Sequence, residues 1–78
     1  MQKYLNLGGN SSVTFFETGT DFIKVWFNNS PSCYLYNYIK PGKVYVEHMK
    51  ELANQGYGLC SYIGKNKYVK YNYFRKGV

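Results

Sequence analysis

The hydrophobic pattern of this chain changes its period at the Lys-Pro-Gly step of residues 40–42, and this change constrains the fold most. Before it, three segments rich in aromatic and β-branched residues alternate between apolar and polar positions: Ser12–Glu17, Phe22–Phe27 and Cys33–Ile39. A period of two is typical of half-buried strands. Their connections are short, and the second contains Pro31, which indicates a loop. Because parallel strands need a crossover of about a dozen residues, the pattern predicts an antiparallel meander.

After this step the apolar residues recur with helical spacing. One stripe collects Tyr45, Val46, Met49, Leu52 and Ala53. Such spacing, at i, i+4 and i+7, is typical of an amphipathic helix. Pro41 suits the start of a helix and Gly56 the position just after its end. The sequence therefore predicts a helix over Gly42–Gln55.

Two later segments are too short to assign from their pattern. Leu59 and Ile63, with Tyr62 between them, fit a helical turn, but five residues fit a strand equally well. Lys67–Phe74 fits either a last strand or an extended tail. With 78 residues, the chain suits one domain. We predict an α+β fold: a three-stranded antiparallel β-meander packed against one main α-helix, followed by a short helical segment and a basic tail.

Strand alternation divides the side chains of the predicted sheet between two faces. We expect one face to pack against the helix and to carry Ile23, Val25 and Phe27 together with Cys33, Leu35 and Ile39. The opposite face would then carry Phe22, Lys24 and Trp26 beside Tyr34, Tyr36 and Tyr38, with Phe16 as a further candidate. The sequence thus predicts a sheet face that combines planar rings with a cation.

The formal charge of +6 lies entirely in the second half of the chain. Residues 1–39 hold two basic and two acidic residues, whereas residues 40–78 hold eight basic and two acidic ones. The last stretch of the chain concentrates five cations, Lys65, Lys67, Lys70, Arg75 and Lys76. This asymmetry suggests an anionic partner, and nucleic acid fits it well. A solvated surface that only keeps the protein in solution fits it equally well.

The rings and the cations together suggest a non-enzymatic module that binds RNA or single-stranded nucleic acid, because bases stack on aromatic side chains while cations meet phosphates. The binding residues would be Lys24, Trp26, Tyr34, Tyr36, Tyr38, Lys65, Lys67, Lys70, Arg75 and Lys76. Two alternatives use the same rings. In the first, which is favoured because large exposed apolar patches are rare, the rings form a second small core under the aromatic tail. In the second, the rings contact a protein partner or a second copy of the chain.

The sequence contains few candidates for catalytic or metal-binding residues. His48 is the single histidine, and with Cys33 and Cys60 it lacks the paired spacing of a metal site. No acid is evident to orient a Cys–His pair. We expect no enzyme, no cofactor, no metal and no small-molecule substrate. The chain has no apolar run that would span a membrane and its first residues do not resemble a signal peptide, so we expect a cytoplasmic protein with Cys33 in the core.

An ordered series of residues along the chain resembles the pattern of a known domain family. The series is Ser11-Ser12-Val13, then Ile23, Val25 and Phe27, then Tyr34, Tyr36 and Ile39, and after the helix Gln55-Gly56, Leu59, Ile63 and Tyr68. This series resembles the KTSC domain, a short module named for the C-terminus of some lysyl-tRNA synthetases, which also occurs alone as a small bacterial protein. The resemblance covers about residues 10–68 and leaves 69–78 as a basic aromatic tail.

The resemblance implies a three-stranded sheet with helical C-terminal segments, which favours a helical turn at Leu59–Ile63. RNA binding is suggested for the family. The arginine that members often place just after the Ile63 position is Gly64 here, and the usual Phe-Asn before it is Leu59-Cys60. If that arginine contacts phosphate in the family, Lys65 or Lys67 would have to do so in this chain.

Overall fold

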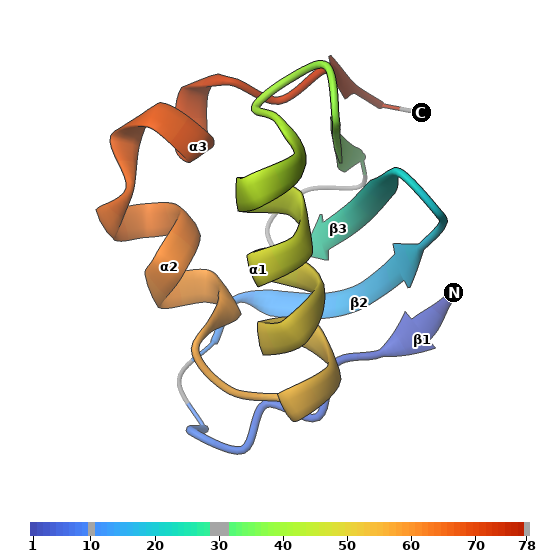
Figure 1. Ribbon diagram of the computed structural model, residues 1–78. Helices are drawn as coiled ribbons and strands as arrows, with labels where there is room; N and C mark the ends of the chain where they lie inside the picture. Colours follow the sequence, from blue (N-terminus) through green and yellow to red (C-terminus); the bar gives the residue numbers. More distant parts are fainter. Residues whose placement is uncertain (10, 29–31, 78) are drawn as a thin grey trace.

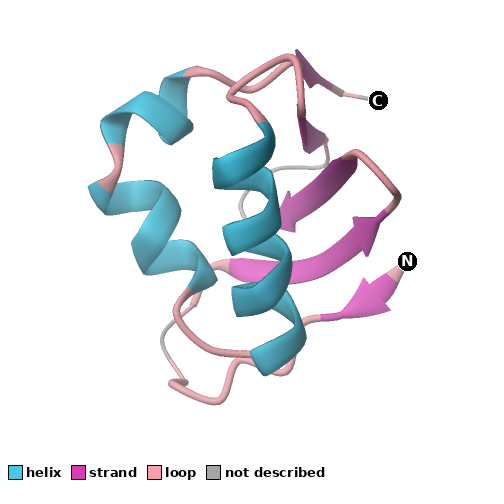
Figure 2. Ribbon diagram, in the orientation of Figure 1, coloured by secondary structure: helices cyan, strands magenta, loops and turns pink. Residues whose placement is uncertain are grey.

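In the described part of the chain, five antiparallel strands form one sheet in chain order, and three helices lie on one of its faces (Figure 1). The structure is a computed structural model and describes residues 1–9, 11–28 and 32–77. The strands are β1 Gln2–Lys3, β2 Val13–Thr18, β3 Phe22–Phe27, β4 Cys33–Asn37 and β5 Arg75–Lys76. The helices are α1 Lys43–Gln55, α2 Leu59–Lys65 and α3 Lys67–Tyr71 (Figure 2). In the described part of the chain, no helix has the length and apolar character needed to cross a membrane.

The three central strands and the main helix are confirmed, with small shifts of their ends. Helix α1 begins after Gly42 and ends at Gln55. The next residue, Gly56, has a left-handed conformation and donates its N–H to the carbonyls of Leu52 and Ala53. The loop predicted at residues 28–32 lies mostly outside the described residues.

The chain ends add structure that the sequence pattern did not predict. Residues near both termini form the two-residue strands β1 and β5 at the two edges of the sheet. The segment that fitted helix or strand at Leu59–Ile63 is helical, and the predicted tail folds into α3 before it joins the sheet. The side chain of Asn66 caps α3 by accepting a hydrogen bond of 3.3 Å from the N–H of Val69.

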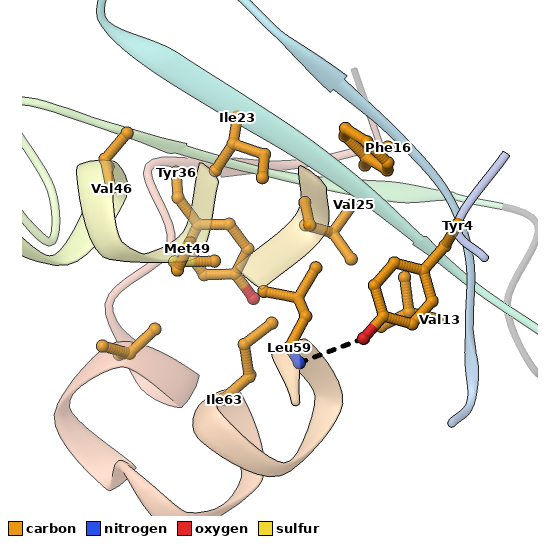
Figure 3. Packing of buried hydrophobic residues seen from close by; sticks show 12 residues of the cluster. Tyr4, Val13, Phe16, Ile23, Val25, Tyr36, Val46, Met49, Leu59 and Ile63 are labelled. Atoms are coloured by element: carbon orange, nitrogen blue, oxygen red, sulfur yellow. Dashed lines mark hydrogen bonds between the residues drawn. The ribbon is translucent and has the colours of Figure 1, made fainter. Parts of the chain in front are cut away.

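The hydrophobic core lies between the sheet and the helices. Helix α1 buries Val46, Met49 and Ala53, as its stripe predicted, and Tyr45 and Leu52 are partly buried. Leu59, Ile63 and Val69 from the two shorter helices belong to the same cluster. Figure 3 shows Leu59 also donating its backbone N–H to the Tyr4 hydroxyl, at 3.2 Å. The core therefore ties the chain ends to the central strands.

The predicted orientation of β4 is wrong. In the antiparallel register Tyr36 lies opposite Ile23 and Tyr34 lies opposite Val25, so these tyrosines share the face that packs against the helices. Cys33 and Leu35 lie on the other face, although Cys33 is buried as expected. Ile39, expected in the core, follows the end of β4 and is 79% exposed. A period of two separates the faces of a strand, but only the register with a neighbour decides which face is inside.

The expected position of Phe16 is also corrected. A β-bulge shifts the register of β2 between Val13 and Phe15. Because a bulge inserts one extra residue into the strand, Val13 and Phe16 both reach the core although they are three residues apart. Phe15 therefore takes the place on the opposite face, where it is 38% exposed.

Candidate nucleic-acid interface

The sheet face turned away from the helices is the first candidate surface, and we call it the open sheet face. Register and alternation place on it Lys3, Phe15, Glu17, Phe22, Lys24, Trp26, Leu35 and Arg75. No helix in the described residues covers this face (Figure 1). Phe15 lies directly opposite Trp26 on the neighbouring strand, so the two rings are cross-strand neighbours.

Positive charge dominates the open sheet face. Glu17 is the one acid among the residues described on this face, and it already faces two cations: the terminal amino group of Met1 at 3.4 Å and Lys24 Nζ at 4.0 Å. Lys24 Nζ also lies 5.8 Å from the centroid of the Phe22 ring. Lys3 and Arg75 form no ion pair with any described residue. The face therefore offers unneutralised cations beside its rings.

Three of the predicted binding residues, Lys24, Trp26 and Arg75, meet on the open sheet face. Sequence reasoning missed Phe15 and Lys3. The bulge hides the orientation of Phe15, and a two-residue strand leaves no periodic signal at Lys3. Lys76 follows Arg75 in β5 and pairs opposite Tyr34, so it points toward the helix side.

Tyr38 does not lie on the open sheet face and is engaged by helix α1. Its hydroxyl donates to Glu47 Oε2 at 2.7 Å, and Lys50 Nζ lies 2.9 Å from the same oxygen. The hydrogen bond to Glu47 raises the pKa of Tyr38. Hydrogen bonds from Lys50 and then Tyr38 lower the pKa of Glu47. These contacts attach α1 to the segment after β4.

A groove of about 450 Å³ brings the other predicted tyrosines together. We call it the tyrosine groove, and its walls include Phe27, Tyr34, Tyr36, Lys70, Tyr71 and Tyr73. The ring of Tyr34 meets Phe27 and Tyr73 edge-on, with centroids 5.6 and 4.9 Å apart. Lys76 Nζ lies 5.4 Å from the Tyr34 centroid. Tyr34, Tyr36, Lys70 and Lys76 thus gather on the helix side of the sheet.

Lys65 and Lys67 lie elsewhere. Both line a wider groove of about 720 Å³ next to His48, whose ring packs 4.7 Å from that of Tyr62. The ten predicted binding residues are therefore divided among the open sheet face, the tyrosine groove, this wider groove and the Tyr38 contact. They do not form one continuous site.

The described residues contain no cluster of three metal-ligating side chains. Cys60 Sγ lies 3.2 Å from Ser12 Oγ. Burial by itself would raise the pKa of the Cys60 thiol, but hydrogen bonds from Ser12, Ser11 and the Val13 backbone lower it overall.

Comparison of the chain with models of protein families, with curated proteins and with solved structures finds no match.

Proposed function

We propose that this protein is a small non-enzymatic module of the cytoplasm that binds single-stranded nucleic acid, preferably RNA, on its open sheet face. The observation that supports this most is the cross-strand pair of Phe15 and Trp26, on a face that no helix of the described residues covers. A base stacked on such a ring contributes about 1–3 kcal/mol, and every base has a face that can stack. Two adjacent rings would take two successive bases.

The charge of the open sheet face supports the same function. Lys3, Lys24 and Arg75 border the rings, and Glu17 is already opposed by two cations. A phosphate backbone that crosses the rings would therefore meet cations on both sides. The resemblance to the KTSC domain stays a prediction, and helix α2 lies where that resemblance implies a helical segment.

A second candidate function is self-association through the same face. Phe15 is 38% exposed, and the half-buried Trp26 and Leu35 extend the apolar area around it. Aromatic residues are enriched at protein interfaces, so a second copy of the chain is the natural competitor for this surface.

The test is a titration with a single-stranded RNA oligonucleotide at about 50 and 200 mM salt, because phosphate contacts lose affinity steeply over this range. Phe15→Ala is expected to weaken binding by about 5- to 100-fold, the equivalent of one stacked base. The control is Tyr57→Ala, which removes a ring that is 62% exposed and lies off the face. No RNA binding at the lower salt concentration, or an equal loss of RNA affinity in Phe15→Ala and Tyr57→Ala, would contradict the proposal.

Sedimentation over a concentration series distinguishes the two functions. The nucleic-acid module is expected to remain a monomer without RNA. A dimer that Phe15→Ala dissociates, combined with no RNA binding, would establish the second candidate instead.

A further inference from the structure

We infer that the tyrosine groove binds one nucleotide of the bound strand, with the base between the tyrosine walls and a phosphate at Lys70 and Lys76. This inference rests on the proposed function, because it places the end of the same strand in a second site. Its occupant is defined by three features of the groove: an unused hydroxyl, aromatic walls and uncompensated cations.

The hydroxyl of Tyr36 provides the first argument. The residue is 1% exposed, yet this hydroxyl makes no hydrogen bond with any described residue. Every fully enclosed side-chain oxygen or nitrogen in the described structure has a partner, so the Tyr36 hydroxyl keeps a small accessible area, and the tyrosine groove is the cavity that this residue lines. Figure 3 shows its ring among the core residues, with the oxygen on the side of Leu59 and Ile63. A buried donor in this position is available to a ligand.

The Tyr36 hydroxyl is a hydrogen-bond donor as long as it stays protonated. Burial, followed by the nearby Tyr34 and Tyr73, raises the pKa of Tyr36 well above its ordinary value. The hydroxyl therefore stays protonated at neutral pH and can donate to a carbonyl or ring nitrogen of a base.

The size and walls of the groove suit a planar ligand. Its volume of about 450 Å³ is within the range of ordinary small-ligand sites, roughly 300–1,000 Å³. Tyr71, which is 66% exposed, and Tyr73 provide ring surface near Lys70. Aromatic walls with few polar groups are typical of sites for flat heteroaromatic rings.

Charge indicates that this ligand is anionic. Lys70 lines the groove and Lys76 lies over the Tyr34 ring, and the described lining residues include no acid. Neither lysine forms an ion pair with a described residue. Both lysines are exposed, so each can donate charge-assisted hydrogen bonds to the phosphate of a nucleotide whose base lies in the groove.

Strand β5 connects the groove to the open sheet face. Its two residues point to opposite sides: Arg75 lies opposite Leu35 on the open sheet face, and Lys76 lies opposite Tyr34 on the groove side. Because β5 is the edge of the sheet, a strand that crosses the open face passes Arg75 and then Lys76 as it turns round this edge. The nucleotide after the turn is the one placed in the groove.

The experiment is an NMR titration of the whole protein with 5′-UMP and with 5′-AMP, with shifts of the Gly64 and Tyr71 amides as the readout of the groove. We expect saturable binding of at least one mononucleotide. Tyr36→Phe removes only a hydroxyl that has no partner in the protein and should weaken this binding by about 3- to 10-fold, the loss of one hydrogen bond. Lys70→Ala should weaken it by about 10-fold, the loss of one charged contact.

Lys67→Ala is the matched control, because Lys67 lies on the same helix and carries the same charge but does not line the tyrosine groove. It should leave mononucleotide binding unchanged. Shifts that are absent for both mononucleotides, or that Tyr36→Phe and Lys70→Ala leave unaltered, would overturn the inference. RNA binding that Phe15→Ala weakens would then still support the open sheet face, whereas mononucleotide binding without RNA binding would support the groove and reject the proposed function.

Discussion

At the scale of single residues, Glu47 joins two side chains, because it accepts a hydrogen bond from Tyr38 and forms an ion pair with Lys50. Lys50 in turn donates to the carbonyl of Thr20 at 2.9 Å. Through these three side chains, the main helix is attached to the turn between β2 and β3 and to the segment after β4. The contacts depend on an ionised carboxylate, so they should respond to pH.

We predict that acid weakens the fold partly through Glu47. Its pKa is lowered in the folded state by Lys50 and then Tyr38, so its contribution is present above the ordinary glutamate pKa and is lost as the pH falls. Glu47→Gln should lower the urea midpoint at about pH 7. The midpoint of this variant should also decrease less than that of the wild type between about pH 6 and pH 3. Glu51→Gln, on the same helix and without an ion pair among the described residues, is the control. Equal pH profiles for wild type and Glu47→Gln would contradict this prediction.

Gly56 is predicted to tolerate no side chain. Its φ of +76° is in the left-handed region, and a Cβ there would lie 2.6 Å from Leu5 Cβ. Gly56→Ala should therefore reduce the free energy of unfolding by about 1–3 kcal/mol, through backbone strain and the displaced Leu5. Urea unfolding measures this free energy. A loss below about 0.5 kcal/mol would show that the N-terminal segment with Leu5 does not pack against Gly56 as described.

Gly64 is predicted to behave in the opposite way. It lies within α2, and a Cβ there would meet no atom within 4 Å. Because glycine costs conformational entropy in a helix, Gly64→Ala should increase the free energy of unfolding by about 0.5–1 kcal/mol. The same urea series tests it, and destabilisation would indicate that α2 is not a regular helix at this residue.

At the scale of elements, α3 depends on its cap and its packing. A five-residue helix has little stability of its own, and this one buries only Val69. The Asn66 side chain satisfies the Val69 N–H that the first turn leaves without a helical partner. This single contact therefore helps to position Lys70 at the tyrosine groove.

We predict that Asn66→Ala destabilises the protein by about 1 kcal/mol and speeds hydrogen exchange of the Val69 amide. Asn66→Asp should retain the cap, because a carboxylate accepts the same hydrogen bond. Asn54→Ala, an exposed change within α1, controls for the loss of an asparagine. Unchanged exchange at Val69 in Asn66→Ala would show that packing alone holds α3.

The molecule as a whole separates its charges. The acids, Glu17, Asp21, Glu47 and Glu51, all belong to β2, the turn after it and α1, whereas α2, α3 and β5 contain cations and no acid. With an excess of +6, the C-terminal part therefore presents a positive surface that continues round the β5 edge to the open sheet face. RNA affinity should depend on salt accordingly.

We predict a slope of log affinity against log salt of about −2 if Lys3, Lys24 and Arg75 meet three phosphates, since each contact on a single strand contributes about −0.7. Arg75→Ala should reduce the slope by about 0.7. Lys40→Ala removes an exposed cation that lies on neither surface and should leave the slope unchanged. Equal slopes for wild type and Arg75→Ala would exclude Arg75 as a phosphate contact.

The sequence by itself determined the elements that local patterns encode. Alternation and turn residues located the three central strands. Helical spacing together with Pro41 and Gly56 located α1, and the count of charged residues in each half of the chain located the excess positive charge. Each of these signals depends on neighbours within a few residues, so no tertiary information is needed to detect it.

Only the tertiary structure decided which rings are exposed. The register with β3 turned Tyr34 and Tyr36 inward, and the bulge in β2 exchanged Phe15 for Phe16. Edge strands of two residues and a five-residue helix are stable only when other elements pack against them, so the predicted tail could not be assigned from its own pattern. The sequence specified that each strand has two faces, and long-range pairing, which changes with a shift of one residue, selected the face that meets solvent.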